Sequence, residues 1–135
     1  MSESKPKILA SAIGRRREAI ASVRLHSGTA EATVNGKPIS AYFPGLQAKI
    51  RYEFPFKVLN LEHKYSASVK VHGGGQMGQL EAVVLGLSRS LADLKSDYKN
   101  PLRQAGLLTR NPRTRQRRMV GMGGKSRRKK QSPKR

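Results

Sequence analysis

The strongest periodic pattern along the chain is a run of apolar residues at helical spacing. It continues from Leu80 to Tyr98 and predicts one long amphipathic helix. Ala82, Gly86 and Ser90 form a line of small residues along it. A glycine inside a helix costs about 1 kcal/mol relative to alanine. We therefore expect another element to approach closely along this line.

A period of two, which is typical of strands, appears in shorter stretches. Residues 65–72 place Tyr65, Ala67, Val69 and Val71 on one face. Residues 19–26 and 29–34 are expected to be two antiparallel strands. A further short pairing is expected after Asn35-Gly36, which is a strong turn signal.

The remaining body sequence predicts short helices. Residues 39–60 are interpreted as two of them, interrupted by Pro44 and Pro55. Asn100-Pro101 has the order of an N-cap followed by a first helical residue, and that helix is expected to close at Gly106. Strands alternating with amphipathic helices predict an α+β fold, an α/β sandwich in which helices pack on one face of a small sheet.

Charge divides the chain into two parts. Its 135 residues carry a net charge of +20. Residues 1–97 hold 14 basic and all 8 acidic side chains, whereas residues 98–135 hold 14 basic side chains and no acid. We expect a flexible segment over 1–11, a globular domain over 12–110 and an extended basic tail over 111–135. A tail with so few apolar residues gains too little from burial to fold alone, but it can become ordered on a polyanion.

The sequence Gly73-Gly74-Gly75-Gln76-Met77-Gly78 satisfies the G-x-G-x-x-G pattern between a predicted strand and a predicted helix. A dinucleotide site is rejected, because the predicted helix continues past Asp93 and Asp97 and neither acid ends a second strand. Two explanations remain for the glycines. They allow a phosphate, such as one of RNA, to approach the backbone, or they form a tight turn without a ligand.

Other chemistry finds little support in the sequence. Gly124-Lys125-Ser126 lacks the first glycine of a P-loop, since Met119 stands there. The absence of cysteine removes thiolate sites, and His26, His63 and His72 have no metal-ligand spacing. We expect no enzyme activity, metal, cofactor, small-molecule substrate, secretory signal or membrane span.

Three segments together resemble a known family. They are Gly14-Arg15-Arg16-Arg17, the glycine-rich turn through Gln79, and Leu102-Arg103-Gln104-Ala105-Gly106-Leu107-Leu108-Thr109-Arg110, followed by a tail that ends in Lys134-Arg135. In order and spacing they resemble the bacterial form of protein nine of the small ribosomal subunit, from about residue 12 to 135. The tail departs from the family pattern, because Lys130-Gln131-Ser132-Pro133 lacks the usual aromatic residue.

The resemblance implies a structural role in translation, in cytoplasmic ribosomes or those of an organelle of bacterial descent. It implies a left-handed βαβ crossover and a domain on ribosomal RNA (rRNA) in the subunit head, beside neighbouring head proteins. It implies a tail whose end, Lys134 and Arg135, contacts the anticodon stem-loop of P-site tRNA. The residues expected to contact rRNA are Arg15, Arg16, Arg17, Gly73, Gly74, Gly75, Gln76, Arg110, Arg113, Arg115, Arg117, Arg118, Lys125, Arg127, Arg128, Lys129 and Lys130.

Two other classes of protein stay open as alternatives. A histone-like DNA-binding protein would explain the charge but not the order of the motifs. A small nucleotide-dependent enzyme would need NAD or ATP to bind at the glycine-rich turn. A basic peptide that lies on membranes is disfavoured, since the tail has no apolar face.

Overall fold

The chain folds around one mixed β-sheet. The computed structural model describes residues 7–62, 64–117 and 120. The strand order in the sheet is β1-β2-β5-β3-β4. The strands are β1 (Ile8–Arg16), β2 (Ala19–Ser27), β3 (Thr33–Val34), β4 (Lys37–Pro38) and β5 (Tyr65–His72). β2 pairs antiparallel with β1 and with β5, and β5 pairs parallel with β3.

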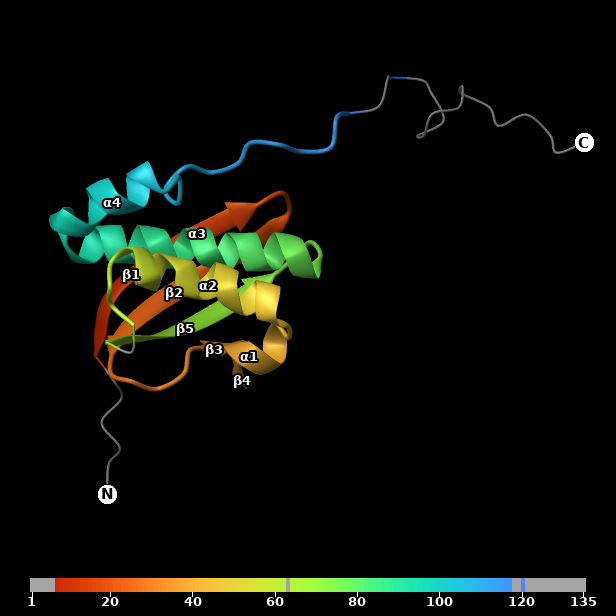
Figure 1. The fold of residues 1–135 in the computed structure, drawn as a ribbon. Coiled ribbons are helices and arrows are strands. Elements are labelled where there is room, and N and C mark those ends of the chain that lie inside the picture. The colour runs from red at the N-terminus through yellow and green to blue at the C-terminus, as the bar shows by residue number, and fades with distance from the viewer. Residues whose placement is uncertain (1–6, 63, 118–119, 121–135) are drawn as a thin grey trace, which may run out of the picture.

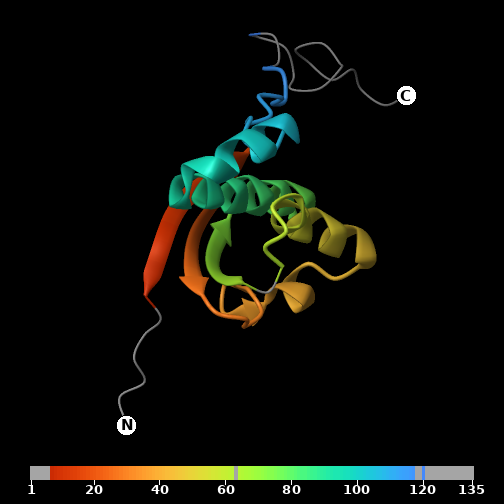
Figure 2. The same cartoon turned by 60° about the vertical axis from the view of Figure 1, so that its left-hand side comes forward.

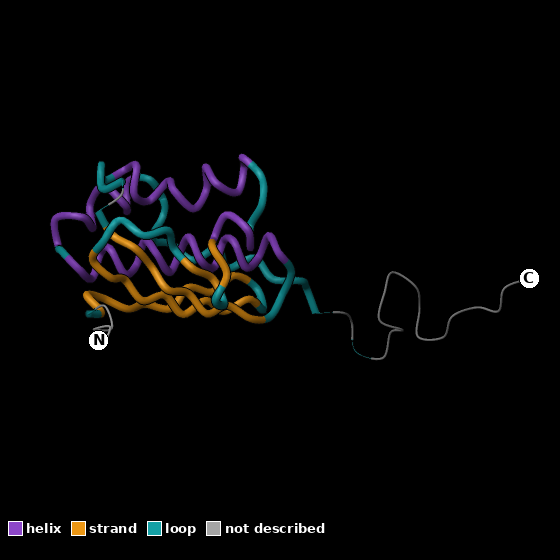
Figure 3. Tube along the Cα trace, turned by 90° about the horizontal axis from the view of Figure 1, so that it is seen from below, coloured by secondary structure: helices purple, strands orange, loops and turns teal. Residues whose placement is uncertain are grey.

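The helices lie together on one face of this sheet, as Figures 1 and 2 show. They are α1 (Ile39–Tyr42), α2 (Leu46–Val58), α3 (Gln76–Leu94), the 3-10 helix η1 (Ser96–Tyr98) and α4 (Lys99–Gln104). α3 packs directly on β1 and β2, and α2 and α4 contact α3 in turn. A view from below separates the strands from the helices (Figure 3). The predicted α+β fold, with helices on one face, is confirmed.

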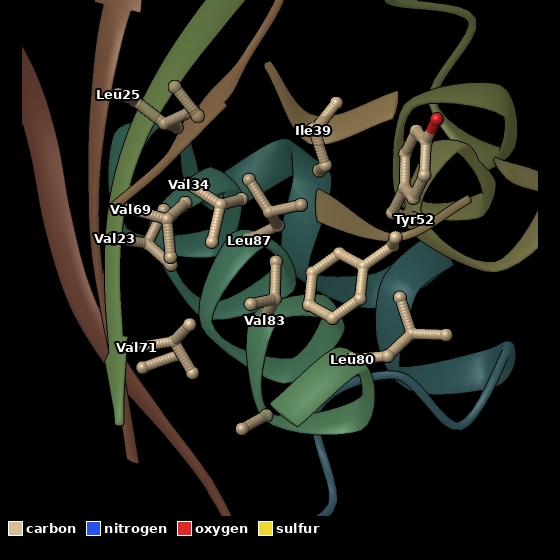
Figure 4. Packing of buried hydrophobic residues seen from close by; sticks show 14 of the residues in the cluster. Val23, Leu25, Val34, Ile39, Tyr52, Val69, Val71, Leu80, Val83 and Leu87 are labelled. Carbon is tan, nitrogen blue, oxygen red and sulfur yellow. The ribbon is translucent and has the colours of Figure 1, made fainter. Parts of the chain in front are cut away.

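The core lies between the sheet and α3, and its residues follow the two periodicities of the sequence. Ala67, Val69 and Val71 of β5 are buried, whereas Lys70 and His72 between and after them are exposed. Figure 4 shows Val69 and Val71 close to side chains of α3. The buried residues of α3 include Leu80, Val83, Leu87 and Leu91, which belong to the apolar run that predicted the helix.

β1 and α3 meet backbone to backbone at two glycines. A Cβ atom on Gly14 would overlap the carbonyl oxygen of Ala82 and would lie 2.5 Å from the amide nitrogen of Gly86. A Cβ atom on Gly86 would lie 2.7 Å from a methyl group of Val23. The close approach predicted from Ala82, Gly86 and Ser90 is confirmed, and β1 is the element that approaches.

The expected pairing of residues 29–34 with 19–26 is wrong. β2 pairs with β5 over its length, from Ile20 to Ser27, and only residues 33–34 of the expected second strand are extended. Asn35 helps to hold β3 beside β5. Its side-chain amide donates to the carbonyl of Val71 at 2.9 Å and accepts from the Val71 amide at 3.0 Å. The short pairing after the turn is confirmed as β3 with β4.

Several predicted boundaries also change. Residues 8–11 belong to β1 and are not a flexible segment, because they pair with β2 up to His26. α2 continues through Pro55, whose burial against the core offsets its missing hydrogen bond. The long helix ends at Leu94, and Asp97 lies in η1. α4 begins at Lys99 and has Tyr98, not Asn100, at its N-cap.

The parallel neighbours β3 and β5 are joined through α1 and α2, which form a βαβ crossover with these strands. The left-handed sense of this crossover, which the family resemblance implies, stays a prediction.

Replacing Gly14 with alanine should lower the free energy of unfolding by about 3 kcal/mol, because the new methyl group would force β1 away from α3. Thermal and urea unfolding of the full chain would measure this. Gly75→Ala is a matched control, since a Cβ there meets no atom within 4 Å. A Gly14→Ala chain as stable as the control would show that the backbone contact is unimportant.

Candidate nucleic-acid interface

Three segments far apart in the sequence meet at one corner of the domain. They are the β1–β2 turn at Arg17-Glu18, the glycine-rich turn, and Thr114-Arg115. The last pair lies near the start of the basic tail over 111–135, which we call the basic arm. Together they line an open hollow of about 810 Å³, which we call the glycine corner. The predicted residues Arg17, Gly74, Gly75, Gln76 and Arg115 are therefore brought together.

The glycines of the corner have different structural roles. Gly73 and Gly74 have φ angles of +79° and +63°, which favour glycine. A Cβ on Gly73 would lie 2.5 Å from the carbonyl oxygen of Glu18. These two residues are thus explained by a tight turn packed on the β1–β2 turn.

Gly75 is different, because its φ is −100° and a Cβ there would meet open space. It precedes α3, whose first turn has no side-chain cap and no acidic residue. Two carboxylates, Glu18 and Glu81, also line the hollow, and that of Glu81 is paired with Arg16. Such a helix end favours an anion, because the helix dipole and the free amides act together.

A chain of polar side chains holds the glycine-rich turn in place. The Tyr42 hydroxyl donates to the side-chain oxygen of Gln79 at 2.8 Å, and the Gln79 amide donates to the carbonyl of Gly73 at 3.1 Å. Asn35 lies 3.5 Å from the same hydroxyl. The sequence indicates Asn35 only as part of a turn and Gln79 only as the end of the glycine-rich motif. It predicts this role for neither of them, nor for Tyr42.

Arg16 ties the arm to the body. Its Nε donates to the carboxylate of Glu81, and one terminal nitrogen donates to the carbonyl of Arg113 at 2.8 Å. The Arg16 side chain is only 10% exposed, whereas Arg15 and Arg17 are exposed. Arg51 lies 3.9 Å from the other oxygen of Glu81. The guanidinium of Arg16 is therefore used within the chain, where it fixes the direction in which the arm leaves.

The other predicted contact residues fall into two groups. Arg110, Arg113 and Arg117 are exposed along the first part of the arm, which runs away from the domain (Figure 1). The second group lies outside the described residues: Arg118, Lys125, Arg127, Arg128, Lys129, Lys130, Lys134 and Arg135.

Two tyrosines have shifted pKa values, and neither belongs to the corner. Burial raises the pKa of Tyr52, and the carboxylates of Glu53 and Glu31 raise it further. Burial also raises the pKa of Tyr65, together with its hydrogen bond to Tyr98, while the charge of Lys95 opposes the shift. Burial is the main cause of both pKa shifts, so they report how the two tyrosines pack in the domain.

Within the described residues, no three His, Cys, Asp or Glu side chains come close enough to hold a metal ion. In the same part of the chain, no helix has the length and apolar character needed to cross a membrane.

Replacing Arg16 with glutamine should loosen the start of the arm, because the bond to the Arg113 carbonyl is lost. We expect the NMR order parameters of the Arg113 and Thr114 amides to fall below about 0.6. Arg17→Gln is the control, since it removes the same charge one residue away. If both variants leave these amides equally ordered, Arg16 does not anchor the arm.

Comparison with known proteins gives matches along most of the chain. A family model described as "Ribosomal protein S9/S16" matches residues 14–135. The small ribosomal subunit protein uS9 of Gloeothece citriformis is 40% identical over 121 residues, which are 89% of this chain and 88% of that protein. The uS9 proteins of Synechocystis and Nostoc punctiforme are 41% and 43% identical over 121 and 112 residues. The match to Synechocystis covers 89% of this chain and 88% of that protein, and the match to Nostoc 81% and 80%. The chain therefore belongs to the ribosomal protein S9/S16 family and is a structural constituent of the small ribosomal subunit.

Proposed function

We propose that this protein binds the rRNA of the small-subunit head through the glycine corner and the basic arm. The observation that carries this proposal is the meeting of Arg17, the amides before α3 and Arg115 at the point where the arm leaves the body. A phosphate in the corner would be bound by helix amides and arginine side chains together.

The arm continues the same interaction away from the domain. Residues 111–117 are exposed and belong to no helix or strand, so their backbone can follow a nucleic-acid strand. No acidic residue occurs from residue 98 onward, and no charge within the arm opposes its approach to phosphate. Arginine suits this role because its planar group can bind two phosphate oxygens at once.

The predicted contacts lie at the corner, on β1 and along the arm. Arg17 holds the rRNA at the corner, Arg15 holds it on the outward side of β1, and Arg110, Arg113, Arg115 and Arg117 lead it along the arm. Arg16 acts indirectly, by positioning the arm. Arg118, Lys125, Arg127, Arg128, Lys129 and Lys130 extend the same contact.

At the end of the arm, Lys134 and Arg135 contact the anticodon stem-loop of P-site tRNA. This part of the proposal rests on the family resemblance and on the two adjacent positive charges of Lys134-Arg135. Their role is electrostatic, because two positive charges near the tRNA backbone slow its release. The protein performs no chemistry in this role, and it takes up neither a cofactor nor a small-molecule substrate.

Binding to a transcript of small-subunit rRNA should weaken steeply with salt. If the chain neutralises about ten phosphates, the log–log slope is roughly −7 to −9. Arg17→Gln with Arg115→Gln should make the slope shallower by about 2. Lys49→Gln with Lys57→Gln removes the same charge from exposed positions of α2 and is the control. Tighter binding to duplex DNA than to rRNA at equal salt would contradict the proposal.

Removing Lys134 and Arg135 should leave assembly of the subunit intact but release P-site tRNA about tenfold faster, which corresponds to about 1.4 kcal/mol. Dissociation of labelled tRNA from reconstituted small subunits would measure this. Arg135→Lys is the control, because it keeps the charge. Equal release rates for the truncated and intact chains would rule out the tRNA contact.

A further inference from the structure

One face of the sheet carries no helix. The helices lie on one side of the strands, as Figures 2 and 3 show, and no element of the described residues covers the other side. We call the outward positions of β1, β2 and β5 on that side the open sheet face. Successive residues of a strand point to opposite faces, so these positions alternate with the buried ones. Arg24 and Lys70, which flank the buried Val23 and Val69, are exposed on this face.

The register of the strands places hydroxyl groups around these two cations. Arg24 lies between Ser11 of β1 and Ser68 of β5, and Lys70 lies beside Ser22 of β2. Arg24 and Lys70 are diagonal neighbours, which are roughly 7–8 Å apart in an antiparallel pair. The middle of the open sheet face therefore combines two positive charges with three serine side chains, and Ile13 of the edge strand β1 lies beside Ser22.

Nothing on the strands neutralises this charge. None of the five strands contains an Asp or a Glu, and every carboxylate of the described residues belongs to a helix, a turn or a loop. One acid, Asp93 of α3, lines a hollow together with Ser11 and Arg24. Positive charges grouped without counter-charges repel each other slightly, and a polyanion removes that cost.

We infer that the open sheet face is a second RNA-binding surface, which contacts the backbone of an rRNA double helix on the side of the domain opposite the helices. Guanidinium and ammonium groups bind phosphate, and serine hydroxyls hydrogen-bond to phosphate or to 2′-hydroxyl groups. The outward positions carry no Tyr or Phe on which an unpaired base would stack, which favours a double helix over a single strand. The exposed apolar side chains of this face, Leu9 and Ile13, lie on the edge strand β1, whereas a protein–protein interface is apolar or aromatic at its centre.

This inference rests on the proposed rRNA binding and adds a surface that is separate from the glycine corner. The two surfaces would place RNA on different sides of one small domain. None of the proposed corner contacts belongs to the pair Arg24 and Lys70, so the two surfaces can be tested separately.

The test compares three double variants of the full chain for binding to a transcript of small-subunit rRNA over a range of salt. One pair lies on the open sheet face, one lies on α2, and the third is Arg17→Gln with Arg115→Gln at the glycine corner. Arg24→Gln with Lys70→Gln should make the log–log slope shallower by about 2. Lys49→Gln with Lys57→Gln on α2 should change it by less than half as much. Circular dichroism and thermal unfolding would verify that all variants fold.

Acylation of lysines, read by mass spectrometry, gives an independent measure. Lys70 should be protected in the binary complex of protein and rRNA, whereas Lys57 should stay reactive. The inference is overturned if Lys70 stays reactive there, or if it becomes protected only in complete subunits, because a neighbouring protein would then cover the face.

The inference is also overturned if the α2 control weakens binding as much as the pair on the sheet. If Arg17→Gln with Arg115→Gln weakens binding while Arg24→Gln with Lys70→Gln does not, the open sheet face fails and the proposed function stands. Loss of rRNA binding by the unaltered chain would instead reject both.

Discussion

The contact between β1 and α3 at Gly14 and Gly86 is the constraint on which the rest of the molecule depends. A methyl group at Gly14 would overlap the backbone of α3, so the strand and the helix touch without side chains between them. This contact fixes how far the helix lies from the sheet, and thereby the width of the core. It also places Glu81, one residue before Ala82, within reach of Arg16, two residues after Gly14. The direction of the arm follows from the same contact.

The charges of the domain have two kinds of role. Arg16 is nearly buried and has specific partners, since burying a charge without partners costs several kcal/mol. Arg17, Arg24 and Lys70 are exposed, as are Arg113, Arg115 and Arg117 of the arm, and their charge is available to a partner. Adjacent arginines thus have different roles. Arg15 and Arg16 alternate along β1, so Arg16 points toward the helices and Arg15 away from them, whereas Arg17 lies in the turn after the strand.

The glycine-rich turn contains glycines of two kinds. Some are explained by packing alone, without a ligand, and one is not. Gly73 and Gly74 are required by the packing of the turn on Glu18 and Ala19, whatever binds there. Gly75 is not required by packing, and it stands where the amides of α3 begin. Tyr42 and Gln79 hold the turn from the side of α1 and α3. These hydrogen bonds favour one conformation of the turn, and a preorganised site loses less conformational entropy when it binds a ligand.

The sequence by itself determined the elements with strong periodicity and the division of charge. The strand at 65–72, the helix around Leu80–Leu91 and the close approach at Gly86 are local patterns of spacing, which a single chain displays without reference to the fold. The acid-free arm is a matter of composition. Only the tertiary structure decided that β5 pairs with β2 and β3. Several strands could pair with the free edge of β2, and the strand that does so lies about 40 residues away in the sequence. It also decided the roles of Arg16 and Tyr42. Their partners lie 65 and 37 residues away, and only folding brings those distant polar groups within hydrogen-bonding distance.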